Sequence, residues 1–289
     1  MLGTAERLSA PGVPAKPRPS TELAKVWLVE GRSDRESYSN GLQIDLSAAT
    51  TNRKRLHEPA GIVYHTTESQ LADFDSSQNR RLQHLGKALL DYVRDERGYH
   101  YVIDRFGRVF RVVAEDNIAF HSGNSVWADP SQTYVNLNGR FLAIAIESAT
   151  RPGDDPAAIT RAQVQSTRLL TEMLRSRYRI AATNCVTHAQ VSVNPSNYRV
   201  GWHTDWAGNF PFEEIGLPDN YEQPLPAIEK FGFGYDAAFF AATGARMWRG
   251  VVAAEDNLRA RAAREGIAIS DLKASLRREY QREIKNQEN

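Results

Sequence analysis

The sequence predicts an α+β (mixed α/β) fold, in which a central mixed β-sheet is flanked by helices and followed by a C-terminal helical extension. Three observations predict it. Short apolar, β-branched runs recur between residues 61 and 188, and two segments with helical spacing of apolar residues lie between them. After residue 226 these runs give way to charged helical patterns. Strands interleaved with helices favour one sheet with helical cover, and a tight strand-turn-strand unit makes that sheet mixed.

The N-terminal part of the chain predicts a leader and two short strands. Residues 1–20 contain four prolines and no apolar core, which indicates a flexible leader rather than an uncleaved signal peptide. Residues 26–29 (VWLV) and 42–46 (LQIDL) are predicted strands, joined by a polar loop with Asn40-Gly41 as its turn signal. We expect them to form a hairpin added to the sheet.

Residues 61–147 supply most of the predicted sheet. Residues 61–65 (GIVYH) and 142–146 (LAIAI) predict buried strands, and residues 98–110 predict two strands around a turn at 104–107. Residues 79–96 predict a helix whose apolar face packs on the sheet and consists of Leu82, Leu85, Leu89, Tyr92 and Val93.

A second helix is predicted to begin at Thr160, because Thr160 and Gln163 can form a capping box. Its apolar face contains Leu170, Met173, Leu174 and Tyr178. A short strand follows at 185–187 (CVT). Cys185 is the only cysteine, which excludes an internal disulfide, and its apolar surroundings predict a small buried side chain rather than a nucleophile.

Residues 235–250 are rich in aromatic residues and alanine, and residues 253–264 and 270–285 have helical patterns. We expect these helices to pack on the preceding domain rather than to form a separate binding module, since no internal repeat is present. The last helix carries a narrow apolar stripe of Leu272, Leu276, Tyr280 and Ile284.

The composition is that of an ordinary globular chain. Thirty-six Lys and Arg balance 35 Asp and Glu, so the net charge of +1 gives no indication of a nucleic-acid or membrane-surface partner. We expect no integral membrane segment and no nucleic-acid binding.

Three stretches end on residues that can bind a metal. Two apolar runs end on His65 and His188, and a Trp-rich loop contains His203-Thr-Asp205. Two histidines and one carboxylate are typical of a catalytic zinc site, where three protein ligands leave one position for water, whose pKa falls to about 7. The spacing therefore predicts a hydrolytic zinc site and nothing narrower.

Further motifs follow in order: residues 98–110, 120–127 (FHSGNSVW), 136–138 (NLN) and 142–147 (LAIAIE). This series resembles the zinc-dependent N-acetylmuramoyl-L-alanine amidases of the type 2 amidase and peptidoglycan-recognition-protein superfamily. The resemblance extends from about residue 61 to 212, roughly half of the chain. It implies that residues 21–222, including the hairpin, form an amidase-like catalytic domain, and that residues 223–289 form the helical extension.

The resemblance also selects the metal ligands. It implies that Zn²⁺ is held by His65, His188 and Asp205, because residues 210–212 (FPF) align with the end of a family pattern that places its ligand at Asp205. His203 then occupies the position of a family lysine that stabilises the oxyanion. Trp and Ala at 206 and 207 replace the Pro-Gly of the family pattern, which is a departure in the ligand loop.

Other roles are likewise implied by the resemblance. Glu147 matches a general base, and Tyr99 a residue whose hydroxyl polarises the substrate carbonyl. His121 and Thr66 are expected to contact substrate, although His121 has the alternative role of orienting a metal ligand. Three further histidines are expected to be structural or solvated: His57, His84 and His100.

The implied reaction is hydrolysis of the amide between N-acetylmuramic acid and L-alanine in peptidoglycan or muropeptides. Two alternatives remain open: a non-catalytic peptidoglycan sensor of the same fold, and a different amidase, either a cytoplasmic enzyme that recycles anhydromuropeptides or a phage-type lysin. The location is periplasmic or extracellular if an export signal is missing from this sequence, and otherwise cytoplasmic.

Overall fold

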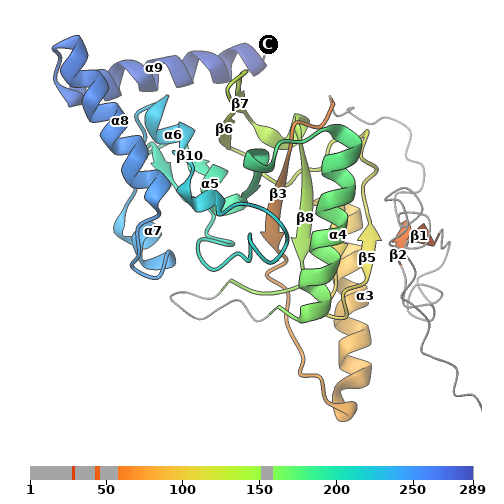
Figure 1. Ribbon diagram of the computed structural model, residues 1–289. Coiled ribbons are helices and arrows are strands. Elements are labelled where there is room, and N and C mark those ends of the chain that lie inside the picture. Colours follow the sequence, from red (N-terminus) through yellow and green to blue (C-terminus); the bar gives the residue numbers. More distant parts are fainter. Residues whose placement is uncertain (1–27, 30–42, 46–57, 151–158, 289) are drawn as a thin grey trace, which may run out of the picture.

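The structure is a computed structural model that describes residues 28–29, 43–45, 58–150 and 159–288 (Figure 1). The predicted leader at 1–20 and the turn signal at Asn40-Gly41 lie outside the described residues. Among the described helices, none has the length and apolar character needed to cross a membrane.

A seven-stranded sheet forms the centre of the fold, with the strand order β1-β2-β5-β4-β8-β3-β9. Only β4 and β5 pair antiparallel, and the other neighbours are parallel, so the predicted mixed sheet is confirmed. Every residue of β3 and β8 is buried, as expected for central strands with helices on both faces. The strands are β1 Leu28–Val29, β2 Gln43–Asp45, β3 Gly61–Thr66, β4 Tyr101–Ile103, β5 Val109–Arg111, β8 Phe141–Ile146 and β9 Cys185–Thr187.

The first two strands do not form the predicted hairpin. They add to the sheet beside β5, but Leu28 and Val29 pair with Gln43 and Ile44 in parallel, so the expected antiparallel direction was wrong. An alternating pattern predicts a strand without giving its direction. Parallel neighbours need a connection of about a dozen residues or more, and residues 30–42 are long enough to provide one.

Two long helices cover opposite faces of the sheet (Figure 1). Helix α3 (Asn79–Glu96) has the predicted bounds and packs through Leu89, Leu90 and Val93 on the face that contains Ala145. Helix α4 (Arg161–Tyr178) packs through Leu170 and Leu174 on the other face, against alternate residues of β3 and β8. The predicted capping box at its start is present: Thr160 Oγ1 accepts from the Gln163 N–H at 3.1 Å, and Gln163 Oε1 accepts from the Thr160 N–H at 2.9 Å.

Short elements connect these layers. Two small antiparallel ribbons, β6–β7 and β10–β11, lie outside the main sheet. Their bounds, with those of the short helices, are β6 Val126–Ala128, β7 Thr133–Val135, β10 Val193–Asn194, β11 Arg199–Val200, α5 His188–Val191, α6 Pro226–Glu229 and α7 Ala237–Ala242, and the 3-10 turns are η1 Ser76–Gln78, η2 Leu137–Gly139, η3 Ala182–Asn184 and η4 Asn220–Glu222.

The C-terminal helices α8 (Arg249–Glu265) and α9 (Ile269–Glu288) pack on each other and on the rest of the molecule (Figure 1). The apolar stripe of α9 is present, since Leu272 and Leu276 are buried against α8. Tyr280 continues it into a second cluster, which joins α8 to residues near β6, α5 and β11. The helices therefore share a hydrophobic core with the part of the chain that carries the predicted ligands.

Candidate metal centre

The three predicted ligands meet at one end of the sheet. His65 is near the end of β3, and His188 follows β9 directly as the first residue of α5. Because β3 and β9 are parallel neighbours, with Tyr64 opposite Thr187, both histidines leave the sheet at the same edge. Asp205 reaches them from the loop after β11, and its backbone carbonyl accepts from the Ala189 N–H at 3.2 Å.

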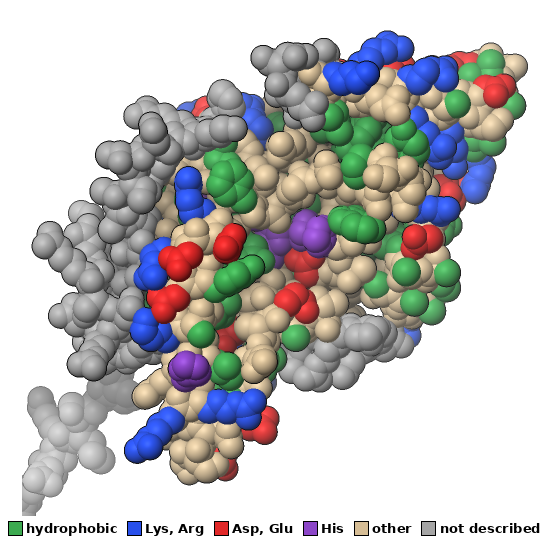
Figure 2. Space-filling model, turned by 180° about the vertical axis from the view of Figure 1, so that it is seen from behind, with side chains coloured by type: hydrophobic (Ala, Val, Ile, Leu, Met, Phe, Trp, Pro, Cys, Tyr) green, Lys and Arg blue, Asp and Glu red, His purple; other side chains and the backbone are tan. Residues whose placement is uncertain are grey.

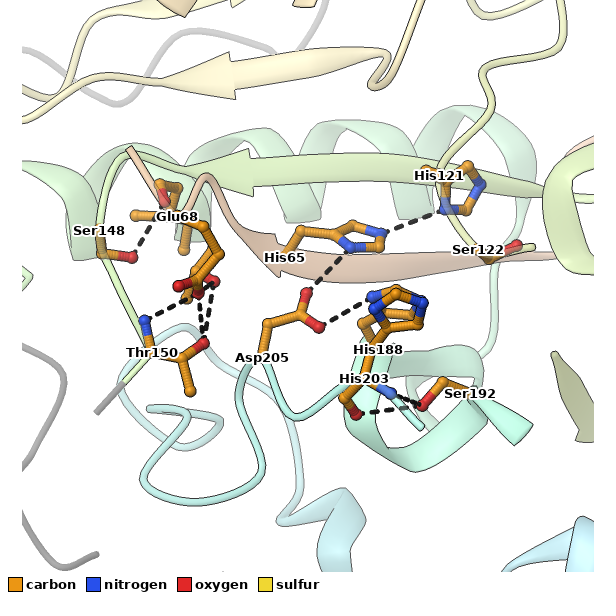
Figure 3. A network of polar contacts seen from close by, with 12 residues as sticks. His65, Glu68, His121, Ser122, Ser148, Thr150, His188, Ser192, His203 and Asp205 are labelled. Atoms are coloured by element: carbon orange, nitrogen blue, oxygen red, sulfur yellow. Dashed lines mark hydrogen bonds and ion pairs between the residues drawn. The ribbon is translucent and has the colours of Figure 1, made fainter. Parts of the chain in front are cut away.

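Asp205 contacts both histidines through different oxygens (Figure 3). Its Oδ2 lies 3.1 Å from His65 Nδ1, and its Oδ1 lies 2.9 Å from His188 Nδ1. The ligand atoms of the three side chains all lie within 4.8 Å of one another. Ligands bound tetrahedrally at zinc distances are about 3.3 Å apart, so this triad fits a zinc-sized ion.

The electrostatics favour the ionisation states that a metal requires. Burial, with the neighbouring His188 adding to its effect, lowers the pKa of His65 to about 4. Burial alone would raise the pKa of Asp205, but its close contacts with His188 and His65 hold it well below its usual range. Neutral imidazole and ionised carboxylate are the metal-binding forms, and the site holds both His65 and Asp205 in them at neutral pH.

His121 lies beside the His65 ring and contacts it directly (Figure 3). Its Nδ1 is 3.1 Å from His65 Nε2, and its Nε2 is 3.2 Å from the carbonyl oxygen of Phe141. The side chain is buried, and burial lowers its pKa well below the usual value. Both ring nitrogens are engaged within the protein, which favours the orienting role predicted for His121 over the contact with substrate.

His203 lies beside the triad without joining it. Its exposed ring stacks on that of His188, with centroids 4.5 Å apart and planes at 16°. Burial of part of the ring, together with the charge of His188, lowers the pKa of His203. Ser192 fixes its backbone, because the Ser192 hydroxyl accepts from the His203 N–H at 3.0 Å and donates to the His203 carbonyl at 3.1 Å.

Aromatic side chains border the site. The ring of Tyr99 lies 5.0 Å from that of His65, and burial followed by the charge of Asp205 raises its pKa, so the hydroxyl keeps its proton. Trp202 is 60% exposed next to His203. Figure 2 shows histidine side chains at the surface near the centre of one face, with a hydrophobic side chain beside them and acidic side chains close by.

Glu147 follows β8 on the same side of the sheet as His65. Ala145 is paired with His65, and strand alternation puts Glu147 on the face of Ala145. The carboxylate is buried, and its Oε2 accepts from the backbone N–H of Arg105 at 3.0 Å. Burial raises the pKa of Glu147, while the Arg105 hydrogen bond opposes that shift.

Thr66 is the last residue of β3, and its hydroxyl makes hydrogen bonds to other side chains of the protein. It donates to Glu68, and it lies 3.2 Å from Oγ1 of Thr150. Glu68 also accepts from the Thr150 N–H at 2.8 Å and lies at a positive φ of 50°. The sequence reasoning did not identify Glu68 or Thr150, since a carboxylate just after a strand has no distinctive pattern.

Asn138 is a second residue whose part in the site was missed. Its side-chain oxygen accepts from the backbone N–H groups of His121 and Ser122, at 3.0 and 2.8 Å, and from the Ser122 hydroxyl at 3.0 Å. The motif at 136–138 does not indicate which loop the asparagine side chain contacts.

The remaining histidines and the cysteine match their predictions where the structure describes them. His100 is buried, donates to the Asn117 carbonyl and accepts from the Ala143 N–H, both at 2.9 Å, so it is structural. His84 is exposed, and His57 lies outside the described residues. Cys185 is buried, and burial raises the pKa of its thiol to about 12, which excludes a thiolate nucleophile at neutral pH.

The fold and the triad together define an α/β protein with a two-histidine, one-carboxylate metal-binding site. The family model described as N-acetylmuramoyl-L-alanine amidase (Amidase_2) matches residues 55–209 of the 289, and the chain belongs to this family. The predicted family is thus confirmed. Comparison with curated proteins gives no match.

Solved structures similar to this chain include three from different organisms. The N-acetylmuramyl-L-alanine amidase AmiD from E. coli, in complex with the substrate anhydro-N-acetylmuramic acid-L-Ala-D-γ-Glu-L-Lys, is 21% identical with a TM-score of 0.42, over 57% of this chain and 59% of AmiD. AmpDh3 from Pseudomonas aeruginosa, in complex with anhydromuramic pentapeptide, is 22% identical with a TM-score of 0.41, over 81% and 78%. Drosophila PGRP-LB is 14% identical with a TM-score of 0.37, over 53% and 85%.

Proposed function

We propose that the protein is a zinc-dependent amidase that hydrolyses the bond between N-acetylmuramic acid and L-alanine in peptidoglycan or muropeptides. The observation that carries this proposal is the triad of His65, His188 and Asp205, whose ligand atoms lie within 4.8 Å in a chain of the amidase family. A protein that only binds peptidoglycan has no need of a complete hydrolytic ligand set.

The donor set supports zinc as the metal. Two imidazole nitrogens and one carboxylate oxygen form a common catalytic zinc site, whereas Mg²⁺ and Ca²⁺ prefer ligand sets made of oxygen. When bound, zinc supplies a water of lowered pKa and polarises the scissile carbonyl. The three side chains that would hold it come from three separate segments of the chain, so the complete site forms only in the folded protein.

Glu147 is proposed as the general base. It takes a proton from the attacking water and delivers that proton to the leaving amine of L-alanine. A pKa raised by burial suits this role, because the carboxylate then holds the transferred proton more readily than an exposed glutamate does. The hydrogen bond from the Arg105 N–H to Oε2 restrains the carboxylate.

Tyr99 and His203 are proposed to donate hydrogen bonds to the carbonyl oxygen as negative charge develops on it. Both flank the triad, Tyr99 beside His65 and His203 beside His188. Because the pKa of His203 is lowered, its neutral ring acts through one N–H, in place of the permanent charge of a lysine. The roles of Thr66 and His121 in binding substrate remain predictions.

The test is to incubate the protein with peptidoglycan sacculi and, separately, with an anhydromuropeptide, and to identify products by mass spectrometry. Release of free stem peptides that stops with a chelator and returns with zinc is the expected result. Zinc-loaded protein that binds either substrate without releasing peptide would refute the proposal in favour of a sensor. Preference for the soluble muropeptide would indicate recycling, and preference for sacculi a wall-degrading enzyme.

A further inference from the structure

We propose that His121 is a positioning residue that determines which ring nitrogen of His65 is available to the metal. The inference rests on the metal site of the proposed function, but not on its substrate. It starts from a chain of two hydrogen bonds. His65 Nε2 lies 3.1 Å from His121 Nδ1, and His121 Nε2 lies 3.2 Å from the carbonyl oxygen of Phe141.

The backbone carbonyl sets the direction of this chain. A carbonyl oxygen only accepts, so His121 Nε2 must carry the hydrogen. A neutral imidazole has one N–H, so His121 Nδ1 accepts, and His65 Nε2 is the donor to it. With Nε2 committed as a donor to His121, Nδ1, the nitrogen that lies 3.1 Å from Asp205, is the one that can offer a lone pair to a metal. The Phe141 carbonyl thus selects the metal-binding nitrogen two hydrogen bonds away.

His121 is itself held in place. Its side chain is 7% exposed, and its backbone N–H donates to Asn138 Oδ1 at 3.0 Å. The same oxygen accepts from the backbone and hydroxyl of Ser122, so one carboxamide fixes the loop on which His121 lies. A ring anchored at its backbone and at both nitrogens keeps a single orientation, as a positioning group requires.

The second histidine ligand has no such partner. His188 Nδ1 lies 2.9 Å from Asp205, but its Nε2 is buried and has no hydrogen-bond partner among the described residues. Within the part of the chain that the structure describes, one imidazole of the triad is thus oriented by a dedicated acceptor and the other is not. Groups that hydrogen-bond to a metal-bound histidine typically contribute about 10–100-fold to metal affinity, and His121 is where we expect that contribution.

Three variants separate positioning from general stability. His121→Leu removes the acceptor and leaves an apolar side chain, whereas His121→Asn keeps an oxygen at the position of Nδ1. Tyr64→Phe is the matched control. It removes a buried hydrogen bond, of 2.7 Å to Thr171, from the neighbour of His65 on the opposite face of β3.

The readout is the zinc dissociation constant, obtained by competition with a chromophoric chelator after stripping and reloading the full-length protein. We expect His121→Leu to weaken zinc binding about 10–100-fold, His121→Asn to recover most of that loss, and Tyr64→Phe to bind as the wild type does. A folded His121→Leu protein with wild-type affinity would overturn the proposal.

Nitrogen-15 NMR of the wild-type protein without metal tests the tautomers directly, even if His121→Leu does not fold. His121 should carry its hydrogen on Nε2, and a hydrogen on His121 Nδ1 would overturn the proposal. The two proposals fail separately. Wild-type protein that binds no zinc contradicts the proposed function, and the spectra then still decide the tautomer of His121.

Discussion

The imidazole of His203 lies flat against the imidazole of His188, with ring centroids 4.5 Å apart. Of the two, only His188 belongs to the triad. The stack places His203, a hydrogen-bond donor, beside the metal site without making His203 a ligand. The two histidines therefore have separate proposed roles, His188 as a metal ligand and His203 as a donor.

Replacing His203 with Ala should therefore lower kcat and leave zinc content unchanged. One donor to the developing oxyanion is lost, and such donors typically contribute about 100–1,000-fold. Steady-state kinetics on an anhydromuropeptide, with zinc content measured on the same samples, would check this. His203→Lys, which supplies a permanent cation, should retain activity, and His84→Ala on the exposed face of α3 is the control. An Ala variant with full kcat would exclude the proposed role.

Glu147→Gln should bind zinc normally and lose about 100–10,000-fold in kcat, because the amide cannot accept the proton of the attacking water. The carboxamide oxygen can still accept from the Arg105 N–H, so little structural change is expected. Kinetics and metal analysis on the purified variant test the prediction, with Glu222→Gln, an exposed partner of Arg249, as the control. Undiminished turnover in Glu147→Gln would remove Glu147 from the mechanism.

His100 should make the fold sensitive to acid. Burial lowers its pKa to about 4, whereas a histidine in the unfolded chain titrates near about 6.5. The contribution of neutral His100 to the free energy of unfolding is complete above the pKa of the unfolded chain, about 6.5. It is lost as the pH falls from there towards 4, because the unfolded chain takes up the proton first.

Urea unfolding across this pH range would measure the effect. A single proton taken up on unfolding corresponds to a slope of about 1.4 kcal/mol per pH unit. His100→Asn should reduce that slope by up to about 1.4 kcal/mol per pH unit. At neutral pH the variant should be less stable than the wild type, because the Asn117 carbonyl loses its donor. Equal slopes in the two proteins would show that His100 does not titrate between the folded and unfolded states.

Trp248→Phe should destabilise the protein by about 1–3 kcal/mol, since the buried Ala207 carbonyl loses the indole N–H that donates to it at 3.0 Å. Zinc affinity should fall as well, because Ala207 lies two residues after Asp205. Denaturant unfolding and zinc competition check both effects. Trp202→Phe is the matched control, since Trp202 is exposed and its replacement should change stability by less than about 0.5 kcal/mol.

The parts of the fold that local patterns encode were predicted from the sequence. The bounds of α3 followed from helical spacing, and the start of α4 from the Thr160 and Gln163 capping box. The triad was predicted because two apolar strands end on histidines and the family pattern aligned with Asp205.

What the sequence did not predict depends on contacts between distant backbones. The direction of β1 and β2 is not encoded in alternation, and the expected hairpin was wrong. The partner of His121 is a main-chain carbonyl at Phe141, which has no signature in the residue types. The donation from Trp248 to Ala207 likewise joins two segments whose sequences give no sign of each other.

That last contact changes how the chain divides into modules. Residue 222 is the predicted end of the catalytic domain, yet the loop that follows Asp205 is braced by an indole from beyond that point. Tyr221 adds a second brace by donating from its hydroxyl to the Trp206 carbonyl at 2.6 Å, while its ring stacks on that of Trp248. A graft of residues 21–222 onto another carrier would keep the Tyr221 hydrogen bond but lose both the Trp248 indole that donates to Ala207 and the ring on which Tyr221 stacks. The segment that carries Trp248 therefore has to be included with the site.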